Sequence, residues 1–150
     1  MRQFWEQEQS EAVYTNSHRQ WRKTFFTGAR LVIKKMLVRN VNKERKGIPS
    51  EILTDDWNSI INDPEIDIIV ELMGGITPAK KYVIEALNAG KQVVTANKDL
   101  LAEYGEEVMS AAEKSGNDLQ FEAAVAGAIP IIRPLKQSMA GNHTTEVMGI

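Results

Sequence analysis

The sequence of 150 residues contains no cysteine, which excludes disulfide bonds, a thiol nucleophile and a thiolate metal site. It has no run of roughly 18 consecutive apolar residues, the length that crosses a membrane as a helix. Its N-terminus lacks the apolar core of a secretory signal. Its two histidines, His18 and His143, are isolated, so they assemble neither a metal site nor a Ser-His-Asp arrangement. We therefore expect a cytoplasmic protein with no membrane partner.

The net charge is also small, and one glycine motif is missing. The net charge is −2, so no overall field attracts nucleic acid. Although 11 of the 18 basic residues precede Gly47, they follow no single helical face, and we expect no nucleic-acid partner. The pattern G-x-G-x-x-G, which forms the phosphate-binding turn of many dinucleotide-binding domains, is absent throughout.

What is present is typical of a globular protein, with 43% hydrophobic and 25% charged residues. Residues 1–28 keep neither helical nor strand periodicity for long, whereas the later chain alternates between the two. The order β-x-β-α-β-α-β-α-β predicts an α/β domain with a doubly wound parallel sheet. Strands are predicted over 31–39, 52–54, 66–71, 92–96, 118–124 and 146–150, and helices over 56–61, 78–89, 103–114 and 129–139.

One βαβ unit, Ile66–Lys98, lies at the centre of this pattern. Its first strand is apolar almost without alternation, which predicts burial on both faces, as parallel sheets require. Thr77 is predicted to cap the helix, with Pro78 at its first position and Gly90 ending it. One face of this helix is formed by Ala79, Val83, Ala86 and Leu87.

Polar residues and glycines follow both strands of this unit. The Gly74-Gly75 pair would let the backbone approach a ring or a phosphate closely, and ligands of such sheets bind beyond the carboxyl ends of the strands. Lys98 could meet a carboxylate, phosphate or carbonyl oxygen, with Thr95 and Asn97 orienting it. The structural alternatives are a tight turn without a ligand, and a helix cap at Asn97 or Thr95 with a solvated Lys98.

Two further segments carry candidate binding residues. Arg39 ends a predicted strand at the position where dinucleotide domains read the adenosine ribose, and an arginine there suits the 2′-phosphate of NADP; the alternative is a surface arginine. Glu122 precedes a run of small residues that exposes backbone carbonyls, and such oxygens can cage a hard cation. The alternative is a buried crossover with small residues for close packing.

Two long stretches now give a resemblance to a known family. They read VELMGGITPAKKYVIEALNAGKQVVTANKDLLAEYG and FEAAVAGAIPIIRPLKQSMAGN. In these motifs the chain closely resembles homoserine dehydrogenase, from about Val32 to Ile150. The resemblance implies NAD(P)H-dependent reduction of L-aspartate 4-semialdehyde to L-homoserine, a small-molecule reaction on the route to threonine and methionine. It also implies a homo-oligomer at full length.

The resemblance implies roles for individual residues. Arg39 would lie at the adenosine 2′ position. Met73 and Gly74 would line NADP or NAD, with Thr95 and Asn97 beside them, and Lys98 would be the catalytic candidate on the cofactor and substrate side. A monovalent cation, sodium, would be held by Glu122, Val125, Gly127 and Ile129, the last three through backbone oxygens.

The chain differs from the family in two ways that limit what the resemblance implies. The family begins with a strand and a G-x-G-x-x-G type loop, which residues 1–28 do not match, and a shifted reading frame is one explanation. It also continues beyond Ile150 into a catalytic domain. We expect an aberrant or poorly ordered segment over 1–30 and a truncated NAD(P)-binding domain over 31–150. Its Rossmann-like sheet would be incomplete, because no first strand or glycine-rich loop is recognisable.

Two functional expectations follow from this. The fragment alone should lack turnover, because the substrate domain is absent from it. The alternative, from a different class, is a non-catalytic nucleotide-binding or interaction module that keeps the Rossmann-like fold.

Overall fold

A computed structural model describes residues 31–127 and 129–148. The predicted aberrant segment 1–30 lies outside the described residues. The chain divides into two compact units, Met1–Ile66 and Asp67–Ile150. Within the described ranges, no helix combines the length and the apolarity needed to cross a membrane.

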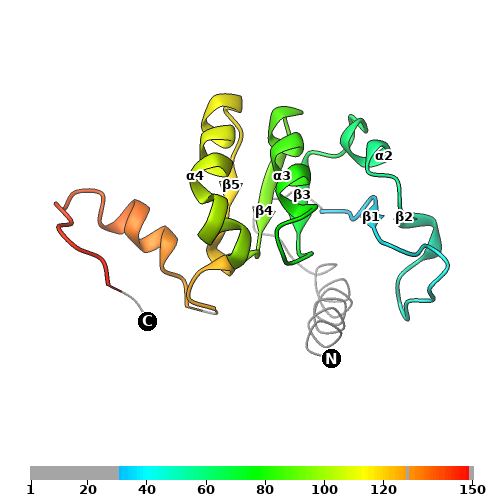
Figure 1. The fold of residues 1–150 in the computed structure, drawn as a ribbon, viewed down its shortest axis with the longest axis horizontal. Coiled ribbons are helices and arrows are strands. Elements are labelled where there is room, and N and C mark those ends of the chain that lie inside the picture. Colours follow the sequence, from blue (N-terminus) through cyan, green and yellow to red (C-terminus); the bar gives the residue numbers. More distant parts are fainter. Residues whose placement is uncertain (1–30, 128, 149–150) are drawn as a thin grey trace. The chain divides into compact units, whose positions relative to one another are not determined.

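A pair of short parallel strands forms the sheet of the first unit (Figure 1). Strand β1 (Met36–Leu37) pairs with β2 (Leu53–Thr54), which follows the short 3-10 helix η1 (Ser50–Ile52). The strand predicted over 31–39 is therefore wrong in extent. A strand is defined by its hydrogen-bonded partner, and β2 supplies only two residues of ladder. The lysines before β1 make side-chain contacts instead.

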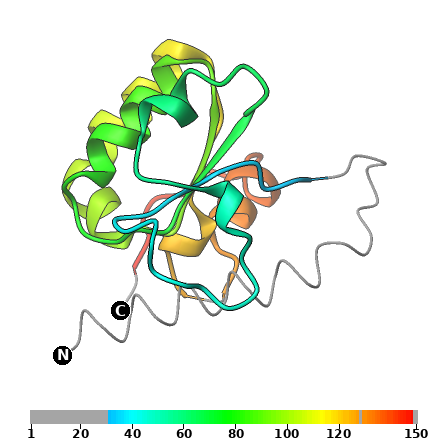
Figure 2. The same ribbon diagram turned by 90° about the vertical axis from the view of Figure 1, so that its right-hand side faces the viewer.

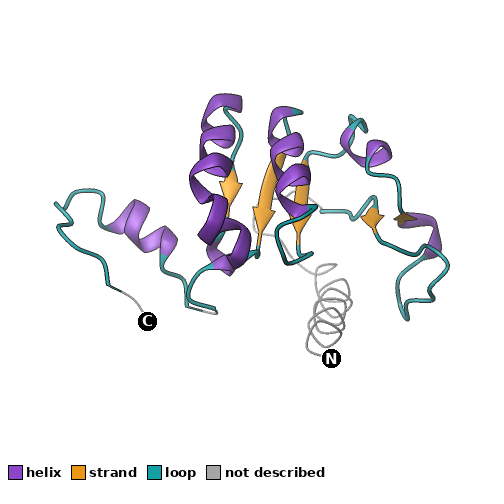
Figure 3. Cartoon of the chain, viewed as in Figure 1, coloured by secondary structure: helices purple, strands orange, loops and turns teal. Residues whose placement is uncertain are grey.

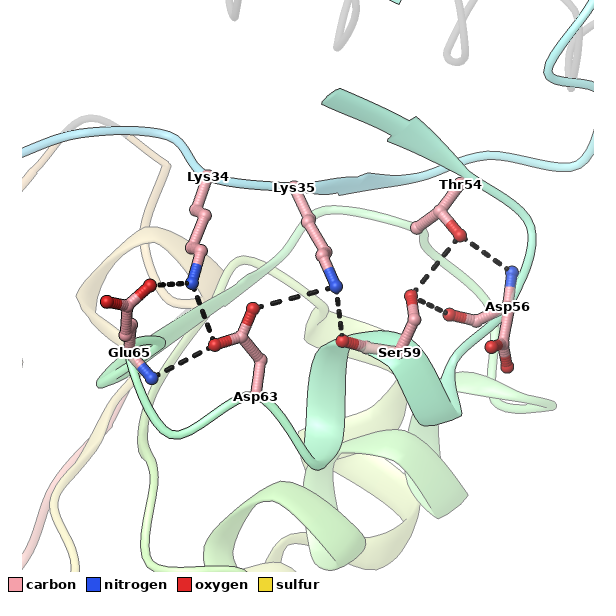
Figure 4. Close-up of polar contacts among 7 residues, drawn as sticks. All are labelled: Lys34, Lys35, Thr54, Asp56, Ser59, Asp63 and Glu65. Atoms are coloured by element: carbon pink, nitrogen blue, oxygen red, sulfur yellow. Dashed lines mark hydrogen bonds and ion pairs between the residues drawn. The ribbon is translucent and has the colours of Figure 1, made fainter. Parts of the chain in front are cut away.

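Those lysines fasten the chain to the turn after α2 (Asn58–Ile61) (Figure 4). Lys34 Nζ donates to Asp63 Oδ1 at 2.8 Å and also to Glu65. Lys35 Nζ donates to the Ser59 carbonyl at 2.6 Å and lies 3.6 Å from Asp63 Oδ2. The hydrogen bond from Lys34, and then the Glu65 N–H, lower the pKa of Asp63, and the Asp63 and Glu65 carboxylates raise the pKa of Lys34.

Helix α2 begins later than its predicted range of 56–61. The Asp56 carboxylate accepts the Asn58 N–H at 2.9 Å and closes a turn before the helix. The N-cap residue is Trp57, which makes no side-chain cap. Asp56 therefore shapes the entry to α2 rather than capping it, and Ile60 is the residue that the helix buries.

Three parallel strands form the sheet of the second unit, in the order β3-β4-β5 (Figure 3). They are β3 (Ile68–Glu71), β4 (Gln92–Thr95) and β5 (Leu119–Gln120). The strands predicted over 66–71 and 92–96 are present over shorter ranges, 68–71 and 92–95, whereas only two residues of 118–124 pair in the sheet. Register pairs Glu71 with Thr95, so β3 and β4 end side by side.

Helices α3 (Ala79–Asn88) and α4 (Lys98–Ser115) cover the same face of this sheet (Figure 2). The predicted inner face of α3 is confirmed. At its end the Lys91 N–H reaches the Ala86 carbonyl at 3.0 Å and the Gly90 N–H reaches Leu87 at 3.1 Å, which is a Schellman motif with Gly90 at φ 82. The fully buried residues of this face are Ala79, Val83, Ala86 and Leu87.

The starts of both helices differ from the prediction. Thr77 does not cap α3. The first turn of α3 is closed by the Lys80 N–H, which donates to the Ile76 carbonyl at 2.8 Å. Helix α4 was predicted to begin at Glu103 but begins at Lys98, and a kink at Tyr104 interrupts its regular geometry. The kink separates the first turn and a half of α4 from the stretch with clear helical periodicity.

Strand β3 is not buried on both faces, which corrects the prediction. Ile68 and Val70 are 43% and 55% exposed, whereas Glu71 at the end of the strand is buried. The physical reason is that α3 and α4 both cover the same face of the sheet, so the residues of β3 that point to the other face are not covered by these helices.

Irregular structure replaces regular elements after β5. The chain continues through the 3-10 helix η2 (Glu122–Ala124) to the π-helical turn η3 (Pro134–Ser138), so the helix predicted over 129–139 is present only in its later part. The predicted strand at 146–150 is wrong for 146–148, which have no strand partner among the described residues. Residues 149–150 lie outside them.

Candidate functional site

The carboxyl ends of β3 and β4 meet at a buried carboxylate. Glu71 is only 4% exposed. Its Oε2 accepts the Thr95 hydroxyl at 2.6 Å, and its Oε1 accepts the Met73 N–H at 2.7 Å. A buried carboxylate needs such donors to offset its lost hydration. Glu71 therefore joins the end of β4 to the turn that follows β3.

That turn depends on two consecutive glycines. Gly74 and Gly75 have φ 70 and φ 67, a left-handed conformation that residues with a Cβ rarely adopt. A Cβ built on either glycine would meet no atom within 4 Å. The glycines are needed for backbone conformation, and the space beside them is open to a ligand.

Asn97 ties the same turn to the start of α4. Its Oδ1 accepts the Leu100 N–H at 3.1 Å, so the helix cap, which the sequence leaves as the structural alternative at Asn97 or Thr95, is formed by Asn97. Its Nδ2 donates to the Gly75 carbonyl at 2.6 Å, and its own N–H donates to Thr95 Oγ1 at 3.0 Å. One buried side chain therefore fixes the helix start and closes the glycine turn.

Lys98 is the first residue of α4 and is exposed. In the described part of the chain, no hydrogen bond or ion pair engages its ammonium group. Met73 is also exposed, on the neighbouring turn. A cationic side chain and an accessible backbone turn thus lie together at the carboxyl ends of β3 and β4, the edge of the sheet where its strands end. The predicted residues brought together here are Met73, Gly74, Thr95, Asn97 and Lys98.

Arg39 belongs to the other unit. It follows β1 by two residues and is exposed. Its expected role toward the adenosine ribose stays a prediction.

Glu122 anchors the start of the last helical segment. Its carboxylate accepts the N–H groups of Ile131, Ile132 and Arg133 at 2.5, 2.8 and 3.0 Å. Desolvation opposes the charged form, but these three donors and the Arg133 charge outweigh it and lower the pKa of Glu122. The carboxylate therefore behaves as a side-chain cap for backbone groups that the helix leaves unpaired.

The loop between Glu122 and this helix contains backbone oxygens that could bind a cation. Ala126 and Gly127 have positive φ angles of 56 and 58, and the Ala126 carbonyl accepts the Ile129 N–H at 3.1 Å. No hydrogen bond among the described residues engages the carbonyls of Val125, Gly127 and Ile129. The donor set suits a hard cation, since such ions prefer oxygen ligands. The described residues contain no cluster of three or more acidic, histidine or cysteine side chains, so backbone oxygens would carry this site.

Sequence reasoning missed one residue of the network, Glu71. The signal was present, because a carboxylate that ends an almost uninterrupted apolar strand must find donors when the strand is buried. Its partners could not be named, because Thr95 lies 24 residues away in the chain.

Parallel strands, helices and a glycine turn at the carboxyl ends of the strands define an α/β domain of the Rossmann type. The family described as "Homoserine dehydrogenase, NAD binding domain" matches residues 6–122, and the chain belongs to this family. The matched range begins before Val32, the approximate start of the resemblance described above. It ends at Glu122, so the loop that follows lies beyond it.

Curated relatives and solved structures agree with this family. The homoserine dehydrogenase of Bacillus subtilis (strain 168) is 44% identical over 124 residues, 82% of this chain and 29% of the relative. That of Mycobacterium tuberculosis (strain ATCC 25618 / H37Rv) is 51% identical over 123 residues, 82% of this chain and 28% of the relative. The crystal structure of a homoserine dehydrogenase from Thiobacillus denitrificans is similar with a TM-score of 0.66 and 46% identity, covering 73% of this chain and 25% of that chain. The chain spans less than a third of the length of these relatives.

Proposed function

We propose that this chain is the NAD(P)-binding part, over 31–150, of an enzyme that reduces L-aspartate 4-semialdehyde to L-homoserine for threonine and methionine synthesis. The family membership supports the reaction class. The observation that carries the proposal is the meeting of the glycine turn, Thr95, Asn97 and Lys98 at the carboxyl ends of β3 and β4. Ligands of this fold bind beyond those ends.

The residues at this edge have complementary tasks. The Met73–Gly75 turn offers an open, Cβ-free surface on which a flat ring can lie. Thr95 and Asn97 are occupied in holding that surface in place. The Lys98 ammonium, exposed at the start of α4, can hold an oxygen of the cofactor or of the substrate carbonyl. The reduced nicotinamide, when bound, supplies the hydride.

Arg39 favours NADP over NAD in this proposal. A guanidinium pairs with a phosphate through two parallel hydrogen bonds, whereas an unphosphorylated ribose is read by a carboxylate. No acidic residue neighbours Arg39 in the sequence, so no adjacent carboxylate is available to bind the ribose of NAD.

A sodium ion is the proposed second ligand, held by Glu122 and the carbonyls of Val125, Gly127 and Ile129. The unengaged carbonyls of this loop support it. The Glu122 carboxylate already binds three N–H groups, so its charge would act on the ion at the same time as it anchors the helix.

The chain alone is proposed to bind the cofactor without turning over substrate, because it spans less than a third of its relatives. Substrate binding and homo-oligomer formation would belong to the whole enzyme. Calorimetric titration of the purified chain with NADPH, and separately with NADH, tests the proposal. We expect saturable binding with NADPH preferred, and loss of that preference in Arg39→Ala.

A second candidate is a non-catalytic nucleotide-binding or interaction module, which the short span of the chain favours. The selectivity of nucleotide binding separates the two candidates, because neither expects turnover by this chain alone; aspartate-semialdehyde-dependent oxidation of NADPH tests that shared expectation. Turnover by the 150-residue chain would contradict the proposal that this chain alone is inactive. Binding that does not discriminate nicotinamide cofactors from other nucleotides favours the module.

A further inference from the structure

The ends of β3 and β4 are held by one continuous hydrogen-bond chain. The Asn97 N–H donates to Thr95 Oγ1, the Thr95 hydroxyl donates to Glu71 Oε2, and Glu71 Oε1 accepts the Met73 N–H. The Asn97 side chain closes the loop by donating to the Gly75 carbonyl. Both ends of the glycine turn are therefore fixed by residues of β3 and of the β4–α4 junction.

Glu71 is the acceptor on which this chain depends. Each of its two oxygens receives one donor, at 2.7 Å from Met73 and at 2.6 Å from Thr95. Such charge-assisted bonds are shorter and stronger than neutral ones. Glu71 is 4% exposed, so it acts through Met73 and Thr95 and does not touch a ligand itself.

We propose that Glu71 is a positioning residue that holds the Met73–Gly75 turn in its binding shape and thereby sets the affinity for the nicotinamide half of the cofactor. This inference rests on the proposed cofactor function. The turn is bound to Asn97, whose neighbour Lys98 is the exposed cation at this edge. The half of the cofactor that reacts must reach that cation, so the turn beside it serves the nicotinamide half.

A glutamine weakens this role of Glu71. Its amide has one acceptor and one donor side, whereas the carboxylate accepts from both partners. If the amide oxygen accepts the Met73 N–H, the amide N–H can only donate to Thr95 Oγ1, so the Thr95 hydroxyl hydrogen loses its acceptor and both contacts lose the carboxylate charge. The volume of the side chain is nearly unchanged, so the substitution leaves no cavity at this buried position.

The test compares Glu71→Gln with the wild-type chain, using two ligands. The ligands are NADPH and 2′-phospho-ADP-ribose, which has the same adenosine half and no nicotinamide. We expect Glu71→Gln to weaken NADPH binding about tenfold, the loss expected for one hydrogen bond to a charged group, and to leave binding of the second ligand unchanged. Glu103→Gln, the same substitution at an exposed site of α4, is the matched control and should change neither.

The outcomes separate this inference from the proposed function. Equal weakening of both ligands, or no weakening of NADPH, overturns the positioning role. If the wild-type chain binds neither ligand, the cofactor function fails, and hydrogen exchange decides the positioning. In Glu71→Leu, which keeps bulk but has no acceptor, the Met73 amide should exchange faster while the Val108 amide in α4 stays protected. An unchanged Met73 amide would contradict the role of Glu71 altogether.

Discussion

The Thr95 hydroxyl donates to the Glu71 carboxylate at 2.6 Å, and the two residues are register partners at the ends of β4 and β3. Both side chains are buried. Their bond means that the open edge of the sheet, where a ligand would bind, is supported by a polar pair inside the unit. Changes to that pair should affect stability and binding together.

Thr95→Val should lower the free energy of unfolding by about 1–3 kcal/mol. Valine has nearly the same shape, but it leaves one oxygen of a buried carboxylate without its donor. Urea unfolding followed by circular dichroism measures the loss. Thr95→Ser is the control, because it keeps the hydroxyl and removes only a methyl group, and it should be the milder change. Equal stability of Thr95→Val and the wild type contradicts a contribution from this bond.

Asn97→Ala should destabilise the start of α4 by about 1 kcal/mol through loss of the cap, and it should also release the Gly75 carbonyl. Asn97→Ser separates the two effects, since serine caps the Leu100 N–H but cannot reach Gly75. Hydrogen exchange at Leu100 and at the turn residues distinguishes them. If Asn97→Ser loosens the turn no less than alanine does while Leu100 stays protected, the tie to Gly75 is a separate function of Asn97.

The anchoring of Ile131, Ile132 and Arg133 by Glu122 should weaken in acid. The folded-state pKa of Glu122 is lowered, so its stabilising effect is present above the ordinary value of 4.5 and is lost as the pH falls below it through the folded pKa. Amide exchange of Ile132, measured from neutral pH downward and corrected for intrinsic rates, should rise in that window. Glu122→Gln should show the acid-state exchange already at neutral pH. A pH-independent Ile132 amide in the wild type would count against this anchoring.

The ion pairs at Asp63 should stabilise α2 only within a limited pH range. The pKa of Asp63 is lowered from 3.8, so its contribution is present above that value and lost as the pH falls through the folded pKa. The pKa of Lys34 is raised from 10.5, so its contribution is present below that value and lost as the pH rises through the folded pKa. Asp63→Asn should speed exchange of the Ile61 amide across this range. Glu65→Gln should do so less, because the Glu65 side chain is 78% exposed.

Helix packing was predictable because it depends on spacing within a short segment. The buried face of α3 followed from residues three and four apart, and Gly90 and Gly116 ended their helices with positive φ. Strand extent was not predictable, because it depends on distant partners. Leu31 to Lys35 has the composition of a strand, yet the described structure pairs only Met36 and Leu37 with β2.

The candidate site divides in the same way. Asn97 could be identified as a cap from its place before a helix, but its bond to Gly75 spans 22 residues and required the fold. The glycine pair predicted a turn, and its left-handed angles agree. Glu71 was missed because a single carboxylate at the end of an apolar strand does not reveal which donors will reach it.

The central claim is that the edge formed by the glycine turn and the start of α4 binds a nicotinamide dinucleotide. Amide resonances of the ¹⁵N-labelled chain, followed during titration with NADPH, test it most directly. We expect saturable shifts that are largest at Met73, Gly74, Thr95, Asn97 and Lys98. No saturable shift at millimolar NADPH, or saturable shifts confined to other residues, would contradict it.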